Sequence, residues 1–344
     1  MEEKKVIILP SDFTIDDVAA SHCFLEVHKC KLDDVEVRFY THEMLGQVFG
    51  DNVYLIDCGP NDYKERGSGC ATGVVCSDFR IADEALDKLI EVLTRNNQTG
   101  FLRQRNFALP FAIRSVQRSV QRTEKDPLLI LRNALEVIDV YLRLKRTKRF
   151  DAGEARAMIL ESKTLNAVDG EMQAFLAEYR GGKKMEYHVF TLPWYIAARM
   201  VLEDKVSDIR DSAKFWFRMF LAIEKARKEA IESLEGRKCF IEIEGSYWFV
   251  AETDNPFITE YVFRYCVVAI VRNPVTGNVA IMTARRNRRF DMSQVGRVLN
   301  QKEKGIWYYN DRIQAVLNGS ARRPQPATKL TIAEIFEIVK ENII

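Results

Sequence analysis

The segment VIILPSDFTIDDVAA, residues 6–20, decides the predicted fold of the N-terminal part of the chain. Its apolar run Val6–Pro10 predicts a buried strand. Thr14 is a favourable N-cap, and Asp16 and Asp17 then fall in the first helical turn, where the helix dipole favours acids. Val18–Val27 continues with a helical apolar pattern. The segment therefore predicts a strand that leads directly into a helix.

The following residues extend this pattern into a sheet. Val35–Tyr40 alternates like a strand, Val53–Ile56 is a buried-strand candidate, and Ile81–Leu93 has the pattern of an amphipathic helix. This order of strands and helices predicts a mostly parallel α/β sheet. Ligands of such sheets bind beyond the carboxyl ends of the strands, and both Asp12 and Asp57 follow predicted strands.

The rest of the chain changes character twice. Helical spacing predominates in Leu128–Leu144, Gly153–Tyr179, Leu192–Val206 and Ile209–Leu234. A small antiparallel sheet and a last helix are then predicted over Cys239–Ile243, Tyr247–Ala251, Val262–Val271, Asn278–Thr283 and Ile332–Ile343. We therefore predict an α/β protein with a mostly parallel N-terminal sheet and flanking helices over residues 1–126, a helical middle region over 127–236, and a small α+β C-terminal domain over 237–344.

Composition excludes several classes of protein. Of the 344 residues, 47% are hydrophobic and 29% charged, which argues against a disordered chain. No apolar stretch approaches the length of a membrane span, and the short apolar run at the start is too short for a signal peptide. Seven cysteines without a Cys-x-x-Cys pair favour reduced thiols in the cytoplasm, and only four histidines are present.

Charge is concentrated in two blocks. The chain carries 51 Lys and Arg against 49 Asp and Glu, but residues 101–150 (the first basic block) hold 12 against 4. Residues 285–330 (the second basic block) hold 11 against 3. Basic blocks on an acidic background indicate a localised anionic partner, with nucleic acid or nucleotide phosphate as the natural candidate. They also allow an acidic protein partner or a homo-oligomer.

The second basic block interleaves arginines with aromatic residues. Guanidinium groups pair with phosphates, and exposed aromatic rings offer stacking faces for unpaired bases. The candidate binding residues of this block are Arg285, Arg286, Arg288, Arg289, Trp307, Tyr308 and Arg312. The alternative is that the aromatic residues belong to the core and the arginines are solvated around them.

The first basic block contains an arginine stripe. Arg114, Arg118 and Arg122 follow at intervals of four residues, so a helix would present them along one side. Such a stripe could track a phosphate backbone, although a solvated helix surface is the commoner explanation of the pattern.

Three carboxylates form the candidate metal site. They are Asp12 and Asp57, which follow predicted strands, and Asp16, which lies at the start of the adjacent helix. Carboxylates suit Mg or Mn. The alternative assigns Asp16 to the helix N-terminus and Asp57 to a turn. The glycine-rich residues 67–73 could cradle a phosphate, but a loop before a buried segment explains them better, and Cys70 has no nearby histidine to activate it.

Three segments resemble the DHH phosphoesterase superfamily, with the melanocyte-proliferating-gene family of exonuclease-like proteins as the closest branch. They are FTIDDVAA (13–20), FYTHE (39–43) and LIDCG (55–59). Weaker similarity covers 214–230 and 265–284, and Arg285, Arg286 and 291–298 resemble the superfamily's substrate-binding C-terminal domain. The resemblance implies an enzyme that uses two divalent ions to activate water, with Asp16 and Asp57 at metal-binding positions.

The chain departs from that family at its histidines. Thr14 stands where the family has its second histidine, and Gly69-Cys70-Ala71-Thr72 stands where it has Asp-His-His-Gln. Two or three carboxylates could hold one ion but hardly two. We therefore expect a nucleic-acid- or nucleotide-phosphate-binding protein whose hydrolytic activity is lost. The alternatives are a Mn- or Mg-dependent phosphodiesterase or exonuclease with a reduced aspartate site, and a protein-interaction scaffold.

Overall fold

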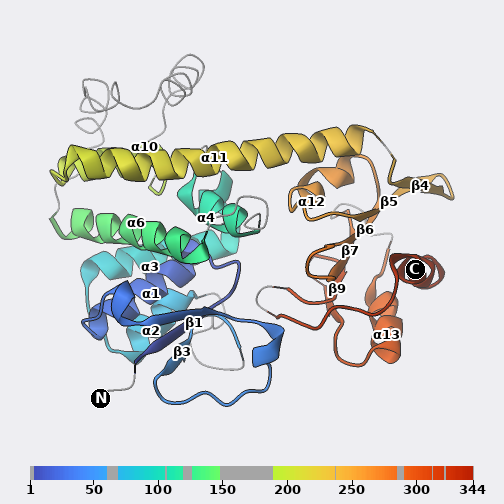
Figure 1. The fold of residues 1–344 in the computed structure, drawn as a ribbon, viewed down its shortest axis with the longest axis horizontal. Coiled ribbons are helices and arrows are strands. Elements are labelled where there is room, and N and C mark those ends of the chain that lie inside the picture. The colour runs from blue at the N-terminus through green and yellow to red at the C-terminus, as the bar shows by residue number, and fades with distance from the viewer. Residues whose placement is uncertain are drawn as a thin grey trace. The chain divides into compact units, whose positions relative to one another are not determined.

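The chain folds into two compact units. The computed structural model describes residues 4–59, 69–104, 107–118, 126–147, 189–236, 238–284, 290–311, 313–320 and 323–343. Unit 1 comprises Met1–Phe39 and Val48–Ile223, and unit 2 comprises Tyr40–Gln47 and Glu224–Ile344 (Figure 1). The three-part division expected from the sequence, with boundaries after 126 and 236, stays a prediction.

Unit 1 contains the predicted parallel sheet. Its strands are β1 (Val6–Leu9), β2 (Glu36–Phe39) and β3 (Val53–Leu55), in the order β2-β1-β3. Both pairings are parallel, and Ile8 lies opposite Arg38 on one side and Leu55 on the other. The central strand β1 is buried along its whole length, as its apolar sequence requires. The carboxyl ends of β1 and β3 therefore lie at one edge of the sheet. The parallel pairing of the strands confirms the predicted α/β class.

Helices predominate in the rest of the described part of unit 1. They are α1 (Ile15–Val27), α2 (Ala71–Asp78), α3 (Glu84–Thr99), α4 (Leu109–Arg118), α6 (Pro127–Thr147) and α10 (Leu192–Val201), with short 3₁₀ turns η1 (Leu32–Asp34) and η3 (Phe101–Gln104). The long helix α11 (Val206–Glu235) contains the division between the units. The predicted helix over 153–179 lies outside the described residues, and α2 forms where the sequence favoured a loop.

The start of α1 confirms the predicted cap. Thr14 is the N-cap, and the carboxylate of Asp17 accepts hydrogen bonds from the Thr14 amide and, at 3.0 Å, from its hydroxyl. This arrangement satisfies groups that a helix start otherwise leaves without partners.

Unit 2 is built on a six-stranded sheet of described residues. Its strands are β4 (Phe240–Ile243), β5 (Ser246–Glu252), β6 (Val268–Arg272), β7 (Val279–Thr283), β8 (Tyr308–Asn310) and β9 (Ala315–Leu317), in the order β4-β5-β6-β7-β9-β8. The 3₁₀ turn η2 (His42–Met44) falls in the N-terminal segment that is grouped with this unit. One face of the sheet packs against α13 (Ser293–Lys302) and α14 (Ile332–Asn342) through a buried apolar core.

The prediction of a wholly antiparallel sheet is wrong at one pairing. Strands β5 and β6 are parallel, while the other neighbours are antiparallel. The predicted strand Val262–Val271 begins only at Val268, because α12 (Ile258–Tyr261) and η4 (Val262–Arg264) precede it. Asn255 anchors this helical connection: its Nδ2 donates to the Ala226 carbonyl at 2.8 Å, and its Oδ1 accepts from the Phe257 amide at 3.0 Å. The connection gives the chain the length that a parallel return requires.

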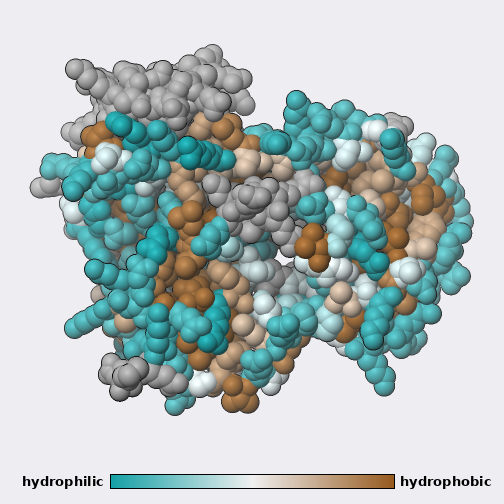
Figure 2. All heavy atoms as spheres, viewed as in Figure 1, coloured by the Kyte–Doolittle hydropathy of each residue, from teal (hydrophilic) through white to brown (hydrophobic). Residues whose placement is uncertain are grey.

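Hydrophilic side chains cover much of the visible face of both units, with hydrophobic residues in smaller patches (Figure 2). Among the described large apolar side chains, Val48 is the most exposed, at 98% of its full exposure. Within the described residues, every helix is too short or too polar to cross a membrane.

A buried ion network holds α6, α10 and α11 together. Arg199 is only 4% exposed, and its guanidinium lies 2.7 Å from Glu136 and 2.8 Å from Asp204. The same group donates to the Ser212 hydroxyl at 2.8 Å. Removing one member of a buried pair leaves the other charge without compensation, which makes such networks costly to break.

We predict that Arg199→Ala lowers the free energy of unfolding by about 3–5 kcal/mol, the usual cost of breaking a buried ion pair. Urea denaturation of the two proteins measures the difference. Arg132→Ala is the matched control, because Arg132 pairs with Asp33 while both side chains are largely exposed; we expect a much smaller loss there. Equal losses in the two variants would contradict a stabilising role for the Arg199 network.

Candidate functional site

The carboxylate of Asp16 lies at the N-terminus of α2. Asp16 is in the first turn of α1 and is 2% exposed. Its Oδ2 accepts from the Ala71 amide at 2.9 Å, and its Oδ1 accepts from the Thr72 amide at 3.0 Å and the Thr72 hydroxyl at 2.7 Å. Asn97 of α3 donates its Nδ2 to Oδ2 at 3.1 Å. One buried carboxylate therefore joins α1, α2 and α3 through four donors.

This geometry explains why α2 forms. The first amides of a helix have no partner within the helix, and the helix dipole makes that end positive, so a carboxylate there is stabilising. The next amide, Gly73 N–H, donates to the Sγ of Cys70, the N-cap residue, at 3.4 Å. The amides that an external phosphate would need are thus engaged by groups of the protein itself. The phosphate-loop interpretation does not fit residues 69–73, and residues 60–68 lie outside the described part of the chain.

Asp12 faces a cation of the first basic block. It follows β1, is buried, and its Oδ2 lies 3.4 Å from an Nη of Arg114 on α4. Gln117, one turn further along α4, donates to the Phe13 carbonyl at 3.1 Å. Helix α4 is therefore docked against the loop between β1 and α1. Arg114 serves as an internal partner for Asp12, and its role in phosphate binding stays a prediction.

Asp57 follows β3 at the same edge of the sheet. It is buried and has a φ of +49°, in the left-handed region that a residue other than glycine seldom adopts. The adjacent Cys58 donates its thiol to the Ile8 carbonyl at 3.3 Å, which ties this turn to β1. The position of Asp57 at the strand end agrees with the sequence, and the strained turn was not foreseen.

The carboxylates do not assemble a metal centre. Among the described residues, no three His, Cys, Asp or Glu side chains form a group suited to a metal ion. Asp16 would have to give up its hydrogen bonds to Ala71, Thr72 and Asn97 before it could coordinate one. Divalent ions such as Mg and Mn take several oxygen ligands. The described side chains therefore do not fit the two-metal chemistry that the resemblance implies.

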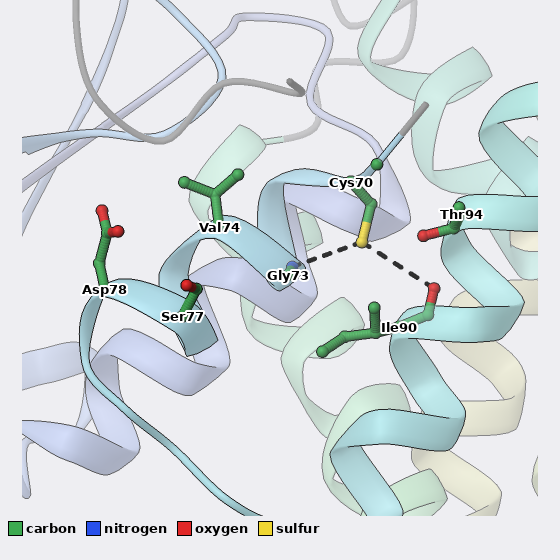
Figure 3. Close-up of a pocket in the computed structure, with 8 residues that line it drawn as sticks. Cys70, Gly73, Val74, Ser77, Asp78, Ile90 and Thr94 are labelled. Carbon is green, nitrogen blue, oxygen red and sulfur yellow. Dashed lines mark hydrogen bonds between the residues drawn. The ribbon is translucent and has the colours of Figure 1, made fainter. Parts of the chain in front are cut away.

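A cavity of about 230 Å³ lies beside the start of α2 (Figure 3). The sulfur of Cys70 points toward Ile90 and Thr94 of α3, and Val74 and Ser77 of α2 also line the cavity. Burial, and then the negative charge of Asp16, raise the pKa of the Cys70 thiol to about 12. At neutral pH this cysteine is therefore a neutral thiol, which does not suit a nucleophile.

The two basic blocks differ in their surroundings. In the first block, arginines bind acids elsewhere in unit 1: Arg132 binds Asp33, Arg143 binds Asp204, and Arg146 binds Glu26 and Asp83. The side chain of Arg118, and all of Arg122, lie outside the described part of the chain. Much of the described positive charge of this block is thus neutralised internally.

The described cations of the second block face solvent. Its described basic residues are all exposed: Arg297, Lys302, Lys304, Arg323 and Lys329. None of these five makes an ion pair with another residue that the structure describes. The predicted binding residues Arg285, Arg286, Arg288, Arg289 and Arg312 lie outside the described ranges.

The aromatic residues of the second block separate into two roles. Trp307 is 3% exposed within the core beneath α13 and α14, and its Nε1 donates to Glu303 at 3.1 Å. It offers no stacking face, which corrects its prediction as a base-binding residue. Tyr308 lies half-buried on the edge strand β8, with the guanidinium carbon of Arg323 5.7 Å from its ring centroid. The alternative prediction, that the aromatic residues belong to the core, holds for Trp307.

Glu303 fastens several segments of unit 2. Its carboxylate accepts hydrogen bonds from the Thr328 hydroxyl, from the Lys329 amide at 2.8 Å, and from Trp307. Partial burial alone would raise the pKa of the Glu303 carboxyl, but the hydrogen bonds outweigh it and hold the pKa below its usual value. The carboxylate thus stabilises the fold in its ionised form.

We predict that Asp16→Ala lowers the free energy of unfolding by about 3 kcal/mol, because it leaves buried amides at the start of α2 without an acceptor. Chemical denaturation followed by circular dichroism measures the loss. Asp34→Ala is the control: Asp34 also accepts a backbone amide, that of Lys31, but in an exposed turn. If Asp16→Ala is no more destabilising than Asp34→Ala, the carboxylate does not hold α2.

The lowered pKa of Glu303 predicts a pH dependence. A carboxyl with a depressed folded-state pKa stabilises the protein above its unfolded pKa, about 4.3 for Glu, and loses that contribution as pH falls through the folded value. The stability difference between the wild type and Glu303→Gln should therefore be largest near neutral pH and shrink below about pH 4. Urea melts of both proteins across this range measure it, and a difference that grows on acidification would refute the assignment.

Comparison with known proteins assigns no family to the chain. No protein-family model matches it, and no curated protein is significantly similar to it. The likeness of residues 13–20, 39–43 and 55–59 to the DHH phosphoesterases thus remains an expectation from short motifs, and function has to be argued from the site itself.

Proposed function

We propose that this chain binds nucleic acid or nucleotide phosphate through the exposed second basic block, and that it is a relative of the DHH phosphoesterases without metal-dependent hydrolysis. The observation that carries the proposal is the contrast between the basic blocks. The described arginines of the first block are engaged by acids of unit 1, whereas the described cations of the second face solvent. Solvent-facing cations are the ones available to phosphate groups.

The neighbourhood of Tyr308 supports the same surface. Tyr308 lies on an edge strand, and Arg323 lies over its ring. An aromatic ring beside an arginine suits an unpaired base and the phosphate that follows it. The run Arg285, Arg286, Arg288, Arg289 belongs to the same unit and adds four basic residues to its sequence.

The state of Asp16 supports the loss of hydrolysis. Water activation by divalent ions requires carboxylates that are free to coordinate them. Asp16 instead accepts hydrogen bonds from the amides of α2, and Asp12 forms an ion pair with Arg114. Binding without cleavage is the function that suits these contacts best.

We predict that labelled single-stranded oligonucleotides are retained by the chain but not cleaved, with or without Mn²⁺ or Mg²⁺. Replacing Arg285, Arg286, Arg288 and Arg289 together by Ala should weaken retention at least about tenfold. It should also flatten the dependence of log affinity on log salt by about 0.7 for each phosphate that the variant no longer neutralises. Fluorescence anisotropy measures binding, and gel electrophoresis of the same samples measures cleavage.

The matched control replaces four exposed basic residues outside both blocks, namely Lys31, Arg218, Lys225 and Lys228. It removes the same charge and should leave affinity nearly unchanged. If the control variant weakens oligonucleotide binding as much as the second-block variant does, the attraction is non-specific and the assigned surface is wrong. Cleavage that requires Mn²⁺ and disappears in Asp57→Asn would instead establish the phosphodiesterase alternative, and Asn suits this test because it tolerates a positive φ.

A further inference from the structure

Two buried cysteines from different helices lie in direct contact. Cys23 is on α1 and Cys76 on α2, and their Sγ atoms are 3.7 Å apart. Cys23 is fully buried and Cys76 is 5% exposed. Both are free thiols in this structure. The two sulfurs therefore already touch, although 53 residues separate them in the sequence.

Several other cysteines have different partners. Cys58 donates to the Ile8 carbonyl at 3.3 Å, and Cys30 donates to the His28 carbonyl at 3.2 Å. Cys70 bonds the backbone of Gly73. Thiols that face a carbonyl or an amide have no second sulfur to react with. Cys23 and Cys76, by contrast, are placed so that they can react with each other.

The surroundings of the pair favour one thiolate over the other. The hydrogen bond between the two thiols lowers the pKa of Cys76 below that of an ordinary thiol, while the same bond and burial raise the pKa of Cys23. The ionised groups that act on the pair are Glu26, Asp83, Asp87 and Arg146. Arg146 neutralises part of this negative charge, since it binds both Glu26 and Asp83. Cys76 is thus the sulfur that loses its proton first, and it is also the more exposed of the two.

We propose that Cys23 and Cys76 form a redox-active dithiol that hydrogen peroxide converts to a disulfide between α1 and α2. The Cys76 thiolate attacks one peroxide oxygen, the O–O bond breaks, and hydroxide leaves, so that Cys76 becomes a sulfenic acid. The sulfur of Cys23 then attacks Cys76 Sγ, the S–O bond breaks, and water leaves with the Cys23 proton. Two thiols are oxidised, one peroxide is reduced, and two waters result.

The disulfide would act on the helix pair that Asp16 joins. Asp16 is on α1, and the amides it caps belong to Ala71 and Thr72 at the start of α2. A covalent link near the other end of α2 would restrict the conformations of the unfolded chain between these two segments, which stabilises the folded state. Oxidation should therefore raise the melting temperature, and reduction should restore it.

The test treats the full chain with hydrogen peroxide and maps peptides under non-reducing conditions. We expect a linked peptide pair containing Cys23 and Cys76, a loss of about 2 Da in intact mass, and reversal of both by dithiothreitol. Recovery of both residues as free thiols, or of Cys76 as sulfinic acid without a linked peptide, would overturn the proposal. This readout uses the wild-type chain and does not depend on any variant folding.

Two variants sharpen the result. Cys76→Ser should abolish both the linked peptide and the rise in melting temperature, whereas Cys239→Ser should keep both, because Cys239 belongs to unit 2. Loss of the link in Cys239→Ser, or its persistence in Cys76→Ser, would contradict the pairing.

Discussion

A single buried carboxylate organises the N-terminal unit. Asp16 leaves the first turn of α1 and accepts hydrogen bonds from the start of α2 and from Asn97 of α3. A helix start carries both unsatisfied amides and a partial positive charge, so the carboxylate supplies what α2 lacks. The same contacts remove Asp16 from the set of groups that could hold a cation. This one interaction therefore stabilises the start of α2 and also keeps Asp16 from coordinating a metal ion.

Equal formal charge does not mean equal availability. Both basic blocks carry a similar excess of Lys and Arg, yet the first is largely matched by acids that folding brings to it, such as Asp33 and Asp204. The second retains exposed cations around α13 and after β9, beside the Tyr308–Arg323 pair. Pairing within a fold lowers the attraction of a cation for an external phosphate. These exposed cations are the reason that the anion-binding surface we propose lies in the C-terminal unit.

Local pattern predicted much of the fold, and long-range contacts explain what it missed. Local sequence is enough to predict β1, the Thr14 cap and α6. The order of these elements along the chain then predicts the parallel sheet. Helix α2 contains glycine and small residues without an apolar stripe, so its own sequence does not predict a helix. The group that stabilises it, Asp16, lies 55 residues away from the amide of Ala71. The parallel β5–β6 pairing depends on a helical connection held by Asn255. Burial of Trp307 and pairing of Arg114 likewise depend on residues distant in sequence.

A crystal structure after soaking in Mn²⁺ would show whether Asp16 is an internal helix cap or a metal ligand. Anomalous scattering would locate any bound manganese without relying on the shape of the density. If Asp16 caps α2, no manganese will lie at the carboxyl ends of β1 and β3, and Asp16 will still accept hydrogen bonds from the amides of Ala71 and Thr72. A manganese ion coordinated by Asp16 and Asp57 at that edge would contradict this role of Asp16.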